Sequence, residues 1–134
     1  PSDKNKKENF QRVDGEDVLK KIRGLKLTSW NFIGENAKTS RRYGPMAQEF
    51  YAAFGQDAIG TIGTETTISV SDMAGILMIA VQALEREKTA QAAQIKAQAE
   101  KIDRLISENA AVNARLDQVV GSNNMVKVAT PISK

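Results

Sequence analysis

The stretch VQALEREKTAQAAQIKAQAEKIDRLISENAAVNARLDQV, residues 81–119, decides the architecture of this 134-residue chain. Its seam residues recur at steps that alternate between three and four, over more than five heptads. Such a repeat places them at positions a and d of a coiled coil. The apolar seam residues are Val81, Ile95, Ile102 and Leu116 at a, and Leu84, Leu105, Val112 and Val119 at d. A head of about 70 residues cannot cover so long a stripe, so we expect partner helices to bury it.

Polar side chains interrupt this seam at four positions, which are Lys88, Gln91, Gln98 and Asn109. A polar residue at a core position lowers the stability of a coiled coil but fixes its register and its number of chains. β-Branched residues occur at both a and d, which shifts the preference from two helices toward three. We therefore predict a parallel homotrimer whose interface contains Asn109 together with the eight apolar seam residues.

The helix that carries the seam has clear sequence limits. Asp72 is a suitable N-cap residue, and no helix breaker occurs before Gly121. We predict one helix over residues 72–120 and a flexible polar tail over residues 121–134. No apolar run approaches the ~20 residues that span a bilayer, so no membrane partner is expected.

Residues 1–71 are predicted to form an α+β head. Asp14 can cap a first helix, and GPMAQEFYAAFG, residues 44–55, is typical of a second. The alternation in LKLTSWNFI, residues 25–33, predicts a strand, and residues 67–70 are a candidate second strand. We expect five aromatic side chains in the core of the head: Trp30, Phe32, Phe50, Tyr51 and Phe54. The fold class is thus a small mixed head followed by a long C-terminal helix that forms a parallel trimeric coiled coil.

Two absences from the composition restrict the chemistry. Without cysteine there are no disulfides, zinc–thiolate sites or thiol nucleophiles, and without histidine the commonest general base and metal ligand is missing. Hydrolytic chemistry would need carboxylates or a Ser–Lys pair. The net charge is only +3, and basic residues are mixed with acidic ones along the coil, so no nucleic-acid partner is expected. No cofactor or metal site is expected either.

The opening residues PSDKNKKENF raise the question of whether Ser2 and Lys7 are a solvated tail or a nucleophile with its base. Serine is a poor nucleophile until a base takes its proton, and lysine can do so only when it is neutral in a dry site. In an extended strand, residues five apart point to opposite faces and lie roughly 17 Å apart. The two side chains can therefore meet only across a tight turn or across a subunit boundary, and assembly could supply that geometry.

Four stretches, in this order, resemble one known family. SDKNKKENF, SWNF, RRYGPMAQEFYAAFG and ISVSDMAGILMIAVQAL are similar to segments of the intramolecular chaperone domain of phage tailspikes and endosialidases. The resemblance covers about residues 2–85 and is followed by a coiled coil, as in that family. The chain departs from the family pattern in places: Asn5 stands where many members carry Arg, although Asn also occurs there, and Arg42 replaces a frequent His, Tyr43 a branched aliphatic residue and Glu49 an Asp.

The resemblance implies a function. Domains of this family lie at the C-terminus of trimeric fibre and spike proteins, guide the folding of the upstream β-rich stalk, and then cut themselves off. By this resemblance Ser2 is the nucleophile of a self-cleaving serine endopeptidase and Lys7 is its base. The family places the cut at the Ser2–Asp3 junction, although a serine hydroxyl can also attack the carbonyl that precedes it.

The partners implied are two further copies of the chain and the upstream segment of its own precursor. The expected location is the precursor of a virion tail fibre or spike, or a bacterial surface protein, from which the domain is released by cleavage. An alternative is a purely structural trimerisation domain of a surface fibre or adhesin that does not cut.

Overall fold

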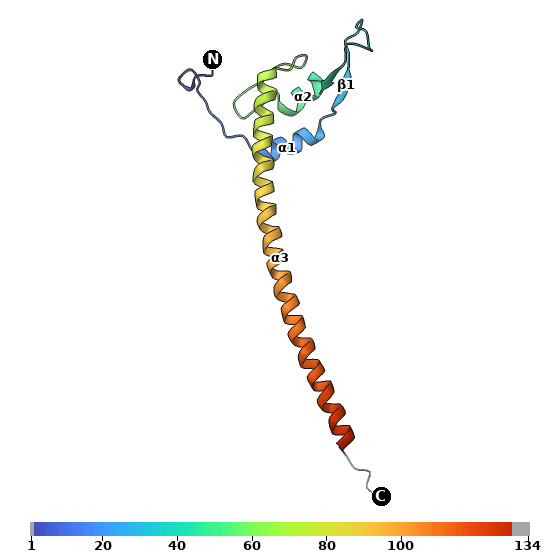
Figure 1. Cartoon of the computed structure of the whole chain (residues 1–134). Helices are drawn as coiled ribbons and strands as arrows, with labels where there is room; N and C mark the ends of the chain where they lie inside the picture. The colour runs from blue at the N-terminus through green and yellow to red at the C-terminus, as the bar shows by residue number, and fades with distance from the viewer. Residues whose placement is uncertain (1, 130–134) are drawn as a thin grey trace. The chain divides into compact units, whose positions relative to one another are not determined.

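The computed structural model describes residues 2–129 and contains a mixed head and one long helix (Figure 1). The elements, in chain order, are the 3-10 turn η1 (Lys4–Lys6), α1 (Gly15–Gly24), β1 (Thr28–Trp30), β2 (Arg42–Gly44), α2 (Ala47–Phe54) and α3 (Val70–Ala129). The predicted fold class of a small mixed head followed by a long C-terminal helix is confirmed. The trimeric state of that helix stays a prediction.

The first helix forms where the sequence predicts it. Asp14 is its N-cap, and the Asp14 carboxylate accepts a hydrogen bond of 2.9 Å from the backbone N–H of Glu16. The helix approaches α3 closely at Gly15, because a Cβ built there would lie 2.8 Å from Cβ of Ala83. Glycine at this position therefore lets α1 lie directly against the first part of α3.

The strand predicted within residues 25–33 is confirmed as β1 (Thr28–Trp30), whereas the candidate second strand at residues 67–70 does not form. β1 pairs antiparallel with β2, and Trp30 lies opposite Arg42. Residues 67–70 form no strand: Thr67 makes only an isolated bridge to Thr64, and Val70 begins α3. Ser69 explains the difference, because its carbonyl accepts the backbone N–H of Met73 and its hydroxyl accepts that of Asp72. These bonds start the helix two residues before Asp72, so Asp72 lies in the first turn rather than at the cap.

The core of the head lies where α1, α2 and the start of α3 meet. Its buried members are Val18, Phe50, Phe54 and Ala80, with half-buried Leu19, Ile22, Ile76 and Ile79 packed against them. The prediction that five aromatic residues form the core is right for Phe50 and Phe54. It is wrong for Phe32, which is 57% exposed on the β-hairpin, whereas Trp30 and Tyr51 are half-buried.

Within the head, the first turns of α3 have two different faces. Ala80 and Ala83 are buried on the side that packs against the core. Leu77 and the seam residues Val81 and Leu84 lie on another side of the helix and remain 51%, 64% and 52% exposed. The compact unit that contains the head extends to Glu87. Within it, the side of α3 that carries these large apolar residues is not covered by the head.

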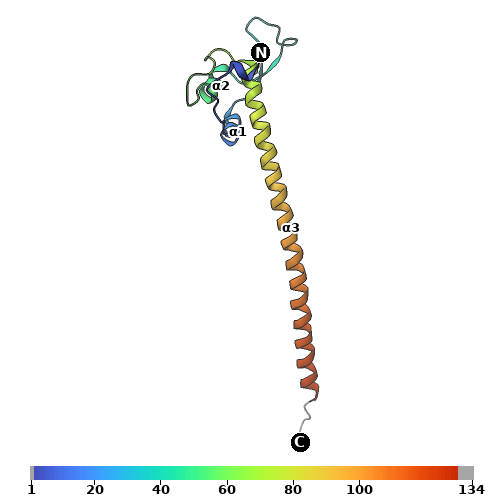
Figure 2. The ribbon, with the colours of Figure 1, turned by 90° about the vertical axis from the view of Figure 1, so that its left-hand side faces the viewer.

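From Lys88 onward, α3 forms a second unit in which every side chain described is exposed. Figure 2 shows that the helix is continuous to its end. It runs to Ala129, so the expected helix end at residue 120 and a flexible tail from residue 121 are wrong for residues 121–129. A single helical glycine such as Gly121 costs only about 1 kcal/mol, which is too little to end the helix. Residues 130–134 of the expected tail lie outside the described residues, and so does Pro1.

No helix among residues 2–129 combines the length and the apolar character needed to cross a bilayer.

Candidate functional site

The N-terminal segment folds into a tight turn around η1. The backbone N–H of Lys6 donates to the carbonyl of Asp3, and that of Lys7 donates to the carbonyl of Lys4, both at 3.2 Å. The Asp3 carboxylate caps the turn by accepting a hydrogen bond of 3.0 Å from the backbone N–H of Asn5. The chain thus reverses locally between Ser2 and Lys7.

This turn brings Ser2 and Lys7 together. Nζ of Lys7 donates a hydrogen bond of 2.7 Å to Oγ of Ser2. The separation lies within the range in which a nucleophile and its base exchange a proton. Of the two routes by which these residues could meet, the tight turn is the one present in the single chain. The catalytic role of the pair and its cleavage site at Ser2 and Asp3 stay predictions.

In a single chain the Ser2–Lys7 pair is exposed to solvent. Ser2, Lys7 and the residues that follow to Asp14 are exposed. Phe10 and Val13, the apolar residues of this arm, are 64% and 52% exposed. A lysine acts as a base only when it is neutral, and water favours the charged ammonium. The chain alone therefore supplies the geometry of a Ser–Lys pair but not the dry environment that its chemistry requires.

A second polar cluster fixes the β-hairpin. The guanidinium of Arg42 forms an ion pair with the Glu35 carboxylate and lies over the rings of Phe32 and Trp30, at 4.9 and 5.8 Å from their centroids. Arg41 donates to the side chains of Asn31 and Ser29. Hydrogen bonds from Arg42 and from the Phe32 backbone N–H hold the pKa of Glu35 below its ordinary value. These contacts shape the hairpin and contain no nucleophile paired with a base.

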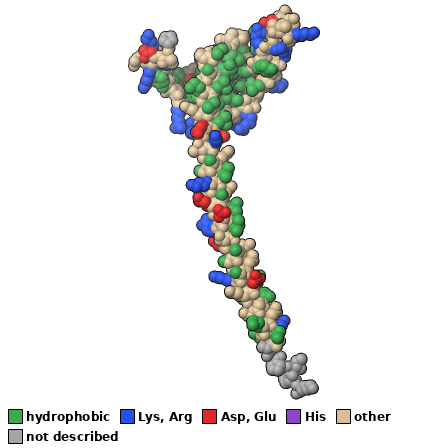
Figure 3. Space-filling view, in the orientation of Figure 1, with side chains coloured by type: hydrophobic (Ala, Val, Ile, Leu, Met, Phe, Trp, Pro, Cys, Tyr) green, Lys and Arg blue, Asp and Glu red, His purple; other side chains and the backbone are tan. Residues whose placement is uncertain are grey.

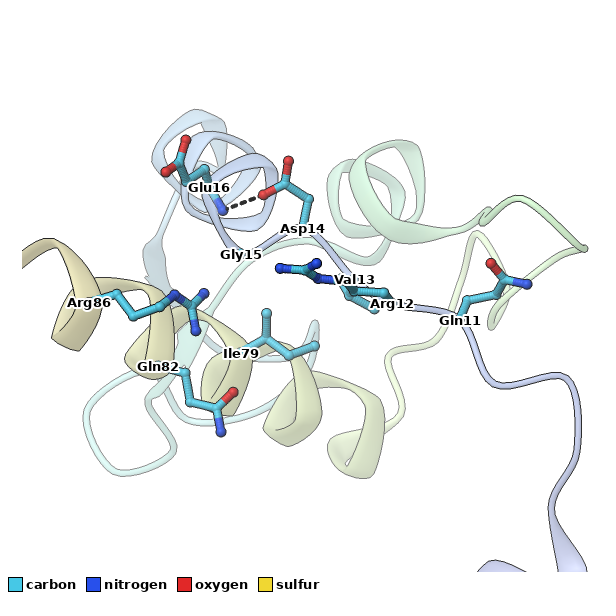
Figure 4. A pocket seen from close by; sticks show the side chains of 9 residues that line it. All are labelled: Gln11, Arg12, Val13, Asp14, Gly15, Glu16, Ile79, Gln82 and Arg86. Carbon is cyan, nitrogen blue, oxygen red and sulfur yellow. Dashed lines mark hydrogen bonds between the residues drawn. The ribbon is translucent and has the colours of Figure 1, made fainter.

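A hollow at the start of α1 has a volume of about 860 Å³ (Figure 4). Arg12 and Arg86 extend into it from two sides, and Asp14 and Glu16 lie at its rim. None of its lining residues is a serine, threonine or lysine. The hollow therefore offers no nucleophile, and among residues 2–129 no three carboxylates gather closely enough to hold a metal ion.

The uncovered face of α3 is the other candidate site. Hydrophobic side chains gather over the head and recur along the helix (Figure 3). The predicted interface residues after Lys88 are between 51% and 66% exposed where they are apolar: Ile95, Ile102, Leu105, Val112, Leu116 and Val119. The polar interface residue Asn109 is exposed as well. In the single chain all of these side chains are open to solvent, which is the state expected of an interface whose partners are absent.

Sequence reasoning missed part of this face. Counting the heptad backward from Leu84 and Leu77 reaches Val70, and all three residues are more than half exposed at position d. Apolar residues also occupy position e, where Met78, Ile106 and Val120 are 69%, 62% and 51% exposed. The repeat itself carries this signal, so extending the count past Val81 and to the neighbouring positions would have found it.

Comparison with known proteins bears on the N-terminal segment. Residues 2–58 match the peptidase S74 family, described as the chaperone of endosialidase. The matched segment begins at Ser2 and contains the whole Ser2–Lys7 turn, α1, the β-hairpin and α2. No protein in the curated set matches the chain.

The similarity of residues 2–58 to this family implies an intramolecular chaperone role toward an upstream fibre segment. It also suggests an autoproteolytic serine peptidase, and the family is associated with phage tail-fibre proteins. The resemblance found in the sequence is thereby confirmed for residues 2–58.

Proposed function

We propose that this chain is a self-cleaving intramolecular chaperone that assembles as a parallel homotrimer. Three copies pair along α3, guide the folding of an upstream β-rich fibre or tailspike segment, and are then released by cleavage next to Ser2. Ser2 is the nucleophile and Lys7 is its base. The observation that carries the proposal is the 2.7 Å hydrogen bond between these side chains, in a turn that lies within the family-matched segment.

The exposed face of α3 supports three chains rather than two. A strict a/d seam is narrow and suits a dimer, whereas apolar residues at e widen the face that must be covered. Met78, Ile106 and Val120 add to the seam in this way. Burial of the stripe in a trimer provides the driving force for assembly, because each large apolar side chain contributes about 1.5–3 kcal/mol when it is removed from water.

Assembly gives the chaperone its template. Three helices in parallel register hold the three upstream segments close together, which raises their effective concentration and favours their pairing in register. Cleavage then removes the template. Once the template has gone, the finished fibre can no longer unfold by the path along which it formed, so its stability becomes kinetic.

The proposed cleavage follows the chemistry of a Ser–Lys pair. Neutral Lys7 takes the proton of the Ser2 hydroxyl as Oγ attacks a neighbouring carbonyl, and it returns that proton to the departing amine. An acyl ester on Ser2 results. Hydrolysis by one water molecule then yields a free carboxylate and regenerates the hydroxyl. The mass of the released fragment tells whether it begins at Ser2 or at Asp3, because the two products differ by one serine residue.

The decisive experiment uses the chain preceded by a β-rich fibre segment. We expect the unaltered protein to give two fragments on a denaturing gel, whereas Ser2→Ala and Lys7→Ala each leave it intact. Lys6→Ala is the matched control, because Lys6 lies in the same turn but its side chain does not contact Ser2. Fragments of unchanged size from both the Ser2 and the Lys7 variants would exclude the proposed pair.

A second candidate function is trimerisation without cleavage. It is favoured by the exposure of Ser2 and Lys7 in the single chain. In that case the protein with its upstream segment would have the mass of three chains by light scattering and would stay uncut on the gel.

A further inference from the structure

The turn that joins Ser2 to Lys7 depends on local contacts. Every residue from Ser2 to Asp14 is exposed, and the hydrogen bonds of the turn join residues within the Ser2–Lys7 segment. A three-residue 3-10 turn is marginal by itself because it fixes several backbone angles for few hydrogen bonds. Whatever stabilises the turn therefore controls how often Nζ of Lys7 lies beside Oγ of Ser2.

Three hydrogen bonds define the turn, and they are not equivalent. The two backbone bonds are each 3.2 Å, at the long end of the usual range, and any sequence could make them. The third joins the Asp3 carboxylate to the backbone N–H of Asn5 at 3.0 Å. Its acceptor is a carboxylate, which strengthens a hydrogen bond, and, besides the Ser2–Lys7 bond itself, it is the contact of the turn that depends on a side chain.

We propose that Asp3 is a positioning residue for self-cleavage: its cap on η1 folds the turn that places Lys7 against Ser2. The inference rests on the proposed function, because it assigns Asp3 a role in that reaction. Without the turn, Ser2 and Lys7 would stand roughly 17 Å apart on opposite faces of an extended chain. The Asp3 carboxylate thus acts through the backbone of the turn and need not touch the Ser2 hydroxyl or the Lys7 amine.

The test compares three variants of the full chain with its upstream fibre segment. Asp3→Ala removes the cap, and we expect cleavage to slow by about 3- to 30-fold, the range that follows from losing a helix N-cap. Asp3→Asn keeps a capping oxygen, so we expect its rate to stay within about two-fold of the unaltered protein. Asn5→Ala keeps the backbone N–H that Asp3 contacts and should leave the rate unchanged.

The pH dependence of the cleavage rate distinguishes a positioning role of Asp3 from a direct electrostatic effect of its charge on the reaction. If Asp3 only holds the turn, the pH at which cleavage reaches half its maximal rate stays the same in Asp3→Asn and in Asp3→Ala. A shifted profile in Asp3→Asn, or a rate as low as that of Asp3→Ala, would overturn the inference. An Asp3→Ala rate equal to that of the unaltered protein would overturn it as well.

Hydrogen exchange at the Asn5 amide tests the Asp3 cap without any cleavage, so failure of this inference can be told apart from failure of the proposed function. In the uncut Ser2→Ala background, we expect the backbone amide of Asn5 to exchange with solvent about 3- to 30-fold faster after Asp3→Ala, and at the original rate after Asp3→Asn. Failure of the unaltered protein to cut would refute the proposed function. Unchanged Asn5 exchange in Asp3→Ala would instead refute the cap.

Discussion

Arg42 shows how one side chain organises an exposed loop. Its guanidinium bonds to both oxygens of Glu35 and at the same time covers the faces of Phe32 and Trp30. A planar, permanently charged group can do both, whereas a lysine or a neutral histidine cannot. Arg42, at the end of the hairpin loop, therefore holds Glu35 within the loop and the aromatic residues at its start together.

The first prediction concerns the pH response of this pair. Arg42 lowers the pKa of Glu35 chiefly by its side-chain hydrogen bond, so the ion pair favours the folded hairpin above the unfolded pKa of the carboxyl. That contribution is lost as the pH falls through the lowered, folded pKa. We expect an NMR titration to place Glu35 below the ordinary range, and Arg42→Gln to move it back upward. Arg41→Gln is the matched control and should leave Glu35 unchanged.

If Glu35 titrates at the same pH in the protein and in Arg42→Gln, the ion pair does not form in solution.

Residue-scale features were predictable where their cause is local. The cap at Asp14 follows from the residues beside it, and so does the confinement of Ser2 and Lys7 to a tight turn. The partner of Arg42 was not predictable, because Glu35 lies seven positions away in a loop whose path no periodicity fixes. Likewise, no pattern reveals that Phe32 stacks under Arg42 on the surface instead of entering the core.

At the scale of elements, α3 has two sides with different residue types, because one side packs against the head and the other is exposed to solvent. Its first turns bury Ala80 and Ala83 against the head, while the a and d positions on another side stay open. Small residues on the packed side let α1 approach closely, whereas large apolar residues on the open side are exposed to solvent. The heptad predicted the open side. It could not predict the packed side, because that side depends on which elements the head places there.

The ends of α3 illustrate a second limit. The helix begins two residues before Asp72 because the carbonyl and hydroxyl of Ser69 both bond to its first turn. It continues past Gly121 to Ala129 because one glycine does not outweigh the helical residues around it. The sequence therefore predicts that this helix exists far more reliably than it predicts where the helix begins and ends.

The second prediction concerns Lys88, a charged residue at an a position of the seam. In a parallel coil its ammonium would lie near the axis, where burial of a charge is costly. We expect Lys88→Ile to stabilise the assembly by about 1–3 kcal/mol per chain, as judged by urea unfolding. Lys96→Ile is the matched control, since Lys96 lies at position b on the outer surface. It should change stability by less than about 0.5 kcal/mol.

Equal effects of the Lys88 and Lys96 substitutions would mean that the heptad assignment is wrong.

At the scale of the whole molecule, the Ser2–Lys7 pair and the exposed face of α3 both lack something that assembly would supply. The Ser2–Lys7 pair has its geometry but remains in water, and the α3 face has its apolar residues but no cover. Assembly of three chains would bury the face and could enclose the N-terminal arms, whose Phe10 and Val13 are exposed. Linking cleavage to assembly in this way would keep a chaperone from cutting itself off before its template exists.

The third prediction follows from this link. Leu105→Asp places a charge in the apolar seam, so we expect light scattering to give the mass of one chain instead of three, with a loss of cleavage of at least ten-fold. Ala114→Asp is the matched control: it adds the same residue to the same helix at outward position f, and it should leave both mass and cleavage unchanged. Because Ala114→Asp adds the same charge to the same helix, an effect on cleavage that is specific to Leu105→Asp would act through assembly. A Leu105→Asp protein with the mass of one chain that still cuts at the original rate would contradict this link. It would show that the Ser2–Lys7 turn is sufficient for cleavage without assembly, even though Lys7 is exposed to solvent.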